Sequence, residues 1–217
     1  MTVFVISAPS GAGKTTLNRR LLKELQQLSM SISHTTRSAR VGEVNGEHYH
    51  FTSKEAFEAM VQRGEFIEWA NVHGNFYGTS FAELERIKKL GKIPLLEIDV
   101  QGWDKIKPLL PDAVSIFILP PSLRQLWDRL ESRGSDSLEV RWKRFQNAYA
   151  EIKESSHYDT LIINADLEEA YQKLRNLVLS ADPKHAGDPE GSKLCKKLNE
   201  EFVSAEWIKG LKEQMKA

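Results

Sequence analysis

A glycine-rich stretch near the N-terminus has residue types that could hold a phosphate group. It is the sequence "APSGAGKTT", residues 8–16, which follows the pattern G-x-x-x-x-G-K-[ST] with Ala8 in place of the first glycine. Backbone N–H groups of such a loop, at the start of a helix, favour an anion through their unpaired donors and the helix dipole. We therefore expect this stretch to bind ATP or GTP phosphates.

Particular residues of the loop would have separate tasks. Lys14 would reach the β- and γ-phosphates, and the Thr15 hydroxyl would take one position around Mg²⁺. Gly11 and Gly13 can adopt backbone angles that other residues resist, whereas the methyl group of Ala8 is tolerated where its φ is negative. The expected ATP-binding residues are Ala8, Pro9, Ser10, Gly11, Ala12, Gly13, Lys14, Thr15 and Thr16.

The rhythm of helix and strand patterns predicts an α/β protein with a doubly wound parallel sheet. Short apolar runs indicate strands at residues 2–7, 29–33, 93–100, 113–119 and 159–164. Helical spacing of apolar residues predicts helices at 15–28, from the prolines at 120–121 to about 132, and at 167–178. After the polar break "RGSDS", a long basic helix is expected to run to about 154.

Residues 34–89 interrupt this rhythm and resemble an insertion. Thr52 and Glu55 fit a capping box that opens a helix to about Arg63. A strand is expected at 65–72, and Thr79 or Ser80 would cap a helix that runs to Leu90.

Composition excludes some classes of function. Lys plus Arg and Asp plus Glu both count 30, so the net charge is zero and no overall field attracts nucleic acid or an anionic membrane. Cys195 is the single cysteine, no run of about 18 apolar residues is present, and the first residues lack a charged signal-peptide region. We expect a cytoplasmic protein with no membrane and no nucleic-acid partner.

Several further stretches resemble guanylate kinase in the right order. They are "SISHTTRSARVGEVNGEHYHF", "EFIEWANVHGNFYGTS", "LLEIDVQG" and "RGSDSLEVRWKRF", and with the phosphate loop the resemblance covers about residues 2–180. It implies transfer of the ATP γ-phosphate to GMP, giving ADP and GDP, on an α/β phosphate-loop (P-loop) core with an inserted GMP-binding region and a small mobile lid. The expected parts are a core of 1–33 and 90–181, a GMP-binding insertion of 34–89, a lid of 133–142, a linker of 182–191 and a C-terminal amphipathic helix of 192–217 with unknown role.

The acceptor phosphate needs cations, preferably planar ones that bind in a bidentate way. Arg37 and Arg40 supply them, although two arginines in a polar loop would, taken alone, indicate only a solvated surface. By resemblance they bind the GMP phosphate with help from Tyr49 and Tyr77.

Guanine offers two N–H donors and the O6 acceptor, so its pocket needs carboxylates and hydroxyls. By resemblance the base-reading residues are Ser33, Glu68, Thr79 and Asp99. Adenine would place a lone pair opposite Glu68, and such mismatches discriminate by about 10⁴-fold. Asp99 follows an apolar strand, and ligands bind at such strand ends in open α/β sheets. A carboxylate buried there without a partner would be costly. Asp99 is also expected to orient water around Mg²⁺.

Phosphoryl transfer mainly requires charge to be neutralised as it spreads over the transferred group. By resemblance Arg133 and Arg144 act from the lid side, and Asn164 lies on the adenine side. The expected catalytic residues are Lys14, Arg37, Arg40, Arg133 and Arg144.

Alternative interpretations remain open at this point. They are a non-catalytic guanylate-kinase-like interaction module, which the intact loop and arginines disfavour, and a kinase for another nucleoside monophosphate. The basic helix with Trp127 and Trp142 could form a nucleic-acid patch, and His48 with His50 could form half of a metal site. The tail stripe favours packing on its own domain over binding a partner, and it could also support self-association.

Overall fold

The computed structural model describes residues 2–72, 74–131, 137–180 and 189–215, and it confirms an α/β fold. The chain forms two compact units. The first unit contains residues Met1–Val5 and Leu25–Ala113, and the second contains Ile6–Glu24 and Val114–Ala217. Strand β1 (Phe4–Ser7) begins in the first unit and ends in the second.

A five-stranded sheet has the strand order β2-β7-β1-β8-β9. In the first unit β2 pairs with β7 in parallel, and in the second unit β8 pairs with β9 in parallel. All six residues of β8 are buried, as expected of a strand in a parallel sheet. The bounds are Leu28–Met30 for β2, Ile93–Glu97 for β7, Val114–Leu119 for β8 and Thr160–Ile163 for β9.

The expected insertion contains a second sheet, of order β4-β3-β6-β5, within the first unit. Its strands are β3 (His34–Thr35), β4 (His50–Phe51), β5 (Phe66–Val72) and β6 (Asn75–Ser80). Ser80 caps α3 (Phe81–Lys89), as predicted. The cap of α2 (Lys54–Gln62) was predicted wrongly, because Ser53 rather than Thr52 accepts the hydrogen bond from Ala56 N.

The first predicted helix is too long, because α1 (Lys14–Glu24) ends before Leu25 and Leu28. Leu28 begins β2 and pairs with Ile93 of β7. Strand pairing therefore overrides the helical spacing of these leucines. A further helix in this unit is α4 (Val100–Ile106).

The second unit carries the helices that follow the last core strands. They are α5 (Leu123–Glu131), α6 (Leu138–Lys153), the 3₁₀ helix η1 (Glu154–His157) and α7 (Leu167–Leu179). Of the expected lid, 133–136 lie outside the described residues, whereas Ser137 caps α6 and 138–142 belong to that helix. Helices α1 and α7 pack against each other.

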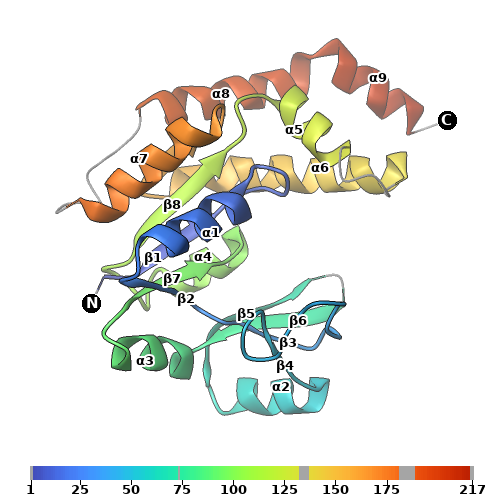
Figure 1. Ribbon diagram of the computed structural model, residues 1–217. Helices are drawn as coiled ribbons and strands as arrows, with labels where there is room; N and C mark the ends of the chain where they lie inside the picture. The colour runs from blue at the N-terminus through green and yellow to red at the C-terminus, as the bar shows by residue number, and fades with distance from the viewer. Residues whose placement is uncertain (1, 73, 132–136, 181–188, 216–217) are drawn as a thin grey trace. The chain divides into compact units, whose positions relative to one another are not determined.

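The C-terminal stripe forms two helices rather than one, α8 (Pro189–Ser204) and α9 (Glu206–Gln214), with a break at Ala205. The start at Pro189 shortens the expected linker, of which residues 182–188 lie outside the described part. The pair packs on its own unit, with α8 against α5, α6 and β9, as Figure 1 shows in red. Among the described residues no helix is long and apolar enough to cross a membrane.

Leu198 tests the packing of the tail, because its side chain is fully buried (0% exposed) whereas Val203 on the same helix is 70% exposed. We expect Leu198→Ala to lower the free energy of unfolding by about 2–5 kcal/mol, through lost contacts and a cavity. Val203→Ala should change it by less than about 0.5 kcal/mol. Urea unfolding of both variants measures the difference, and equal effects would show that α8 is not packed as described.

Candidate functional site

The glycine-rich loop has the backbone that a phosphate-binding turn requires. Gly11 and Gly13 have φ angles of 92° and 94°, a region that strongly favours glycine. Ala12 N donates to Pro9 O at 3.0 Å, and α1 begins directly afterwards at Lys14. The helix start therefore follows the loop as the sequence pattern predicts.

Asn164, directly after β9, supports this loop through a hydrogen bond to its backbone. Its buried side chain donates from Nδ2 to Ala12 O at 2.6 Å. A Cβ at Gly13 would lie 2.4 Å from the same nitrogen, so only glycine fits there. The amide that was expected on the adenine side therefore contacts the loop itself.

Helices α5 and α6 contact the loop as well. Arg144 donates from Nη2 to Ser10 Oγ at 3.1 Å. On α5, side-chain carbons of Leu126 and Leu130 lie 3.3 and 3.4 Å from the position of a Cβ on Gly11. Arg133, the other expected lid arginine, lies outside the described residues.

Arg129 was not predicted as a site residue, yet it touches the same region. Its Nη2 donates to Asn164 O at 3.1 Å. The sequence placed it only in a basic helix, where an exposed side chain is the normal expectation.

In the first unit, Arg37 is held by a glutamate that the sequence analysis did not select. Its Nη2 donates to both carboxylate oxygens of Glu43, at 2.8 and 2.9 Å. Two hydrogen bonds lower the pKa of Glu43 to about 2. The larger contribution comes from the Arg37 guanidinium, and the smaller one comes from Arg40 N, which donates at 2.7 Å. The signal available in the sequence was an acidic residue six positions after Arg37 in a basic loop.

Both expected tyrosines lie beside this arginine. The rings of Tyr49 and Tyr77 are 5.9 Å apart in an edge-on arrangement, and the Arg37 guanidinium lies 5.4 Å from the Tyr49 ring centroid. Arg40 contributes its backbone N–H to Glu43, while the residue itself is exposed.

The expected base-reading residues Ser33, Glu68 and Thr79 lie together. Thr79 N donates to Glu68 Oε1 at 3.0 Å, and the Ser33 and Thr79 hydroxyl oxygens are 3.4 Å apart. Glu68 and Thr79 are partners in the β5–β6 register, next to an irregularity between Phe66 and Glu68. Bulges of this kind re-aim side chains, here into the interior.

Glu68 is only 7% exposed. Burial, opposed by the hydrogen bond with Thr79, raises the pKa of its carboxyl from 4.5 to about 7. Between these pH values the folded chain binds more protons than the unfolded chain, so this group makes stability fall as the pH rises. Displaced carboxyl pKa values are frequent at functional sites.

Asp99 differs from the expectation of a buried carboxylate. It is exposed, and its Oδ1 accepts from Gly102 N at 2.7 Å, which caps α4. A Cβ at Gly102 would lie 3.2 Å from Asp99 Oδ1 and 3.3 Å from Glu68 Oε2, so the two carboxylates flank this glycine. Asp99 thus lies near the base-reading residue Glu68, but as the exposed N-cap of α4 and not as a buried carboxylate.

Two alternative interpretations lose their basis here. Trp127 and Trp142, the aromatic residues of the suggested nucleic-acid patch, are 6% and 8% exposed and offer little surface for stacking. His48 accepts a hydrogen bond from Val44 N at its Nδ1, whereas the His50 ring lies against His34. The two histidines of the suggested metal pair therefore have different partners.

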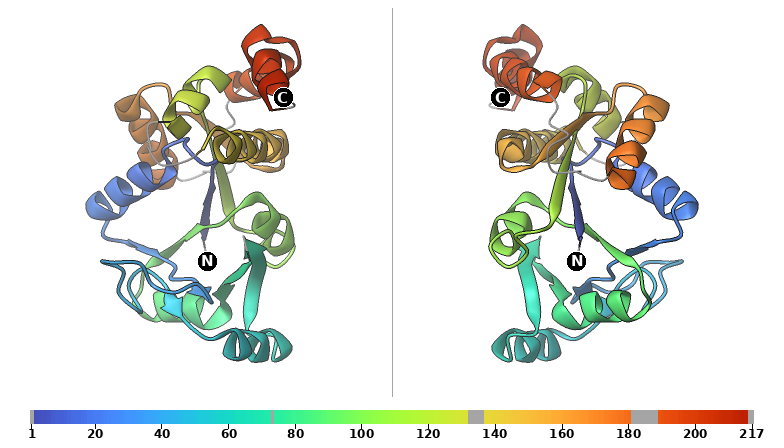
Figure 2. Two further views of the ribbon diagram at one scale, coloured as in Figure 1. Left: turned by 90° about the vertical axis from the view of Figure 1, so that its right-hand side faces the viewer. Right: turned by 90° about the vertical axis from the view of Figure 1, so that its left-hand side faces the viewer.

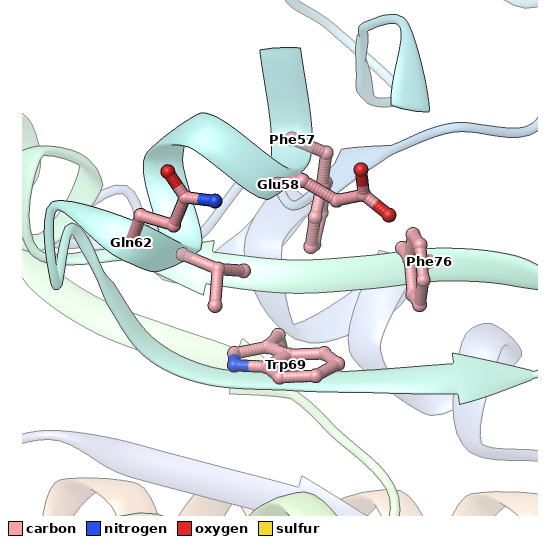
Figure 3. Close-up of a pocket in the computed structure, with 6 residues that line it drawn as sticks. Phe57, Glu58, Gln62, Trp69 and Phe76 are labelled. Atoms are coloured by element: carbon pink, nitrogen blue, oxygen red, sulfur yellow. The ribbon is translucent and has the colours of Figure 1, made fainter. Parts of the chain in front are cut away.

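A separate apolar cavity of about 220 Å³ lies between α2 and strands β5 and β6 (Figure 3). None of the expected site residues lines it. Its lining residues are Phe57, Glu58, Val61, Gln62, Trp69 and Phe76.

Comparison with known proteins identifies the family of the chain. The family model "Guanylate kinase" matches residues 1–181. Guanylate kinase of Neisseria meningitidis serogroup A (strain Z2491) is 49% identical over 176 residues, which cover 81% of this chain and 86% of that protein. Guanylate kinase of Hahella chejuensis is 51% identical over 175 residues, covering 81% and 84%.

A solved structure gives the same result. The crystal structure of guanylate kinase from Anaplasma phagocytophilum matches with a TM-score of 0.67 and 32% identity, covering 90% of this chain and 94% of that one. The matched family model spans the phosphate loop, both arginine positions of the first unit and the base-reading cluster. The chain therefore belongs to the guanylate kinase family.

Proposed function

We propose that the reaction of this chain, the ATP-dependent phosphorylation of GMP to GDP, is divided between two sets of residues. The residues for the donor ATP belong to the second unit, and those for the acceptor GMP belong to the first. The observation that carries this proposal is the cluster of the buried Glu68 and Thr79 with the half-buried Ser33, because its chemistry matches guanine.

On the donor side, the loop N–H groups and Lys14 hold the ATP phosphates. Lys14 is the first residue of α1, so its charge adds to the positive end of the helix dipole. Arg144 reaches the loop at Ser10, where its guanidinium can neutralise charge on the transferred phosphoryl group. Asn164 acts as a positioning residue for the loop through Ala12.

On the acceptor side, Arg37, Arg40, Tyr49 and Tyr77 bind the GMP phosphate. Glu43 already places both of its carboxylate oxygens against Nη2 of Arg37, and a phosphate group offers paired oxygens of the same kind. The carboxylate therefore holds the guanidinium ready, and the incoming phosphate takes its place. The exposed Arg40 supplies a second cation.

The base is read by hydrogen bonds that only guanine completes. The ionised Glu68 carboxylate accepts from N1–H and from the N2 amino group, while Ser33 or Thr79 donates to O6. Asp99, beside Glu68 at Gly102, offers a further acceptor. Adenine has no hydrogen on N1 and would leave the buried carboxylate unpaired, which is costly.

Thr15 and Asp99, each taken by itself, carry the kind of oxygen that suits a magnesium ion. Mg²⁺ is usually bound by one or two protein oxygens together with substrate phosphates and water. Thr15 presents an exposed hydroxyl in the first turn of α1, and Asp99 presents an exposed carboxylate in the first unit. When bound with ATP, the ion would neutralise charge on the phosphates.

The location that suits this function is the cytoplasm, and we include it in the proposal. The single cysteine, Cys195, lies next to Ser155 Oγ at 3.0 Å and cannot form an internal disulfide. Such usage is typical of a reducing compartment.

A panel of monophosphates tests the proposed substrate. With ATP and Mg²⁺, we expect kcat/KM for GMP to exceed that for AMP by about 10⁴-fold, because of the unpaired carboxylate with adenine. ADP release in a coupled assay with GMP, AMP, CMP and dTMP measures this ratio. Faster phosphorylation of any of the other three would refute GMP as the acceptor.

The pH dependence tests Glu68. Because its pKa is about 7 in the free protein, GMP binding below that pH requires loss of a proton. We expect the KM for GMP to rise up to tenfold for each pH unit below 7 and to level off above about 8. Steady-state kinetics from pH 5.5 to 8.5 give this profile.

Glu68→Gln is the control for this profile, since the GMP phosphate titrates near pH 6 in both proteins. The variant should bind GMP more weakly at pH 8 and retain its KM for ATP. Its KM for GMP should no longer change with a titration near pH 7. Parallel profiles of the parent and the variant would remove Glu68 from the base site.

Lys14 tests the donor side. We expect Lys14→Ala to lower kcat by about 10²–10³-fold through lost charge stabilisation, with little change in the melting temperature. Lys23→Ala is the matched control, because Lys23 is an exposed lysine in the last turn of the same helix. Equal kcat values for the parent and Lys14→Ala would contradict the mechanism.

A further inference from the structure

The C-terminal helices lie beyond residue 181, where the family match ends, and the reaction described above uses none of their residues. They are nevertheless packed into the second unit. Leu198 and Ile208 are fully buried, and Gly191 touches β9 so closely that an added Cβ would lie 2.5 Å from Leu161 Cβ. Figure 2 shows α8 and α9 beside α5 and α6 in two further views.

The contact with α6 is a layer of aromatic rings. Phe202 of α8 stacks on Tyr149 with 3.6 Å between centroids and 5° between planes. Phe202 and Trp207 also lie 5.9 and 5.8 Å from the ring of Phe145. Phe145 is fully buried and directly follows Arg144 in α6. The tail thus packs against the residue next to the arginine that contacts Ser10.

The contact with α5 combines a ring and a carboxylate. Trp207 lies 6.5 Å from the ring of Trp127. Glu201 Oε2 accepts from Leu123 N, the first residue of α5, at 3.4 Å, and a negative charge is favourable at the start of a helix. Helix α5 in turn carries Leu126 and Leu130 against Gly11.

We propose that the tail helices α8 and α9 are a brace that holds α5 and α6 against the phosphate loop, with Phe202 and Trp207 as positioning residues for Arg144. The brace ties together the two helices that touch the loop at Gly11 and Ser10. Loss of a ring lets α6 shift, and misplacement by about 1 Å far from the chemistry can cost up to 10²-fold in rate. This inference rests on the proposed role of Arg144.

The first test is a comparison of kinetics with stability. Phe202→Ala and Trp207→Ala should each lower kcat by about tenfold at 25 °C, while the KM for GMP changes by less than about twofold. Val203→Ala, on the same helix but 70% exposed, is the matched control and should match the parent. Thermal melting shows whether each variant is folded, and Phe202→Leu, which keeps apolar bulk, should recover part of the kcat.

The second test is a double-mutant cycle, because a merely structural role would not couple to Arg144. In an Arg144→Ala background, Phe202→Ala should lower kcat by less than about twofold, since the positioned group is already gone. A full tenfold loss in both backgrounds overturns the brace and leaves the site assignment intact. If Arg144→Ala alone leaves kcat unchanged, the proposed role of Arg144 fails, and the brace fails with it.

A lowered melting temperature with parent kcat in both Phe202→Ala and Trp207→Ala would also overturn the proposal. In that case the tail would contribute stability alone. A loss of kcat in Val203→Ala as large as in the ring variants would also overturn the proposal, because that side chain is exposed to solvent.

Discussion

A loop that binds phosphate through its backbone N–H groups cannot satisfy the same groups internally, so contacts from outside must hold it in shape. In this chain three elements do so. Asn164, directly after β9, binds the carbonyl of Ala12, Arg144 of α6 binds Ser10, and leucines of α5 lie against Gly11. The close approach of Asn164 also explains why Gly13 has no side chain. The second unit is organised by this requirement.

The first unit meets a related requirement, because its partly buried charged groups must be stabilised when no substrate is bound. Arg37 is paired with Glu43, and the pKa of Glu68 is raised to about 7, so that its carboxyl is neutral below that pH. These are the two ways in which a protein tolerates a partly buried charge, pairing and a displaced pKa. Under the proposed function, substrate binding would exchange one anion for another at Arg37 and release a proton at Glu68.

Local signals were sufficient for most of the fold. The apolar runs marked the core strands, and the loop pattern marked the start of α1, because those signals lie in contiguous residues. The end of α1, the cap at Ser53 and the break at Ala205 were missed, since strand pairing and packing decide them. The phosphate-loop residues came from the loop pattern, and the other site residues came from the family resemblance. Glu43 and Arg129 were missed because exposed charge is the normal expectation for their residue types, and the exposure of Asp99 depends on its role as a helix cap.

The tail shows how a segment outside the family match can belong to the same folding unit. Tyr149 and Phe145 lie within the matched part, yet their ring partners Phe202 and Trp207 lie beyond it. Aromatic stacking of this kind contributes about 0.5–1.5 kcal/mol for each pair in addition to buried area. A surface that already carries these rings would expose them without α8 and α9. The matched part and the tail therefore share one apolar layer on helix α6, to which residues beyond the family match contribute.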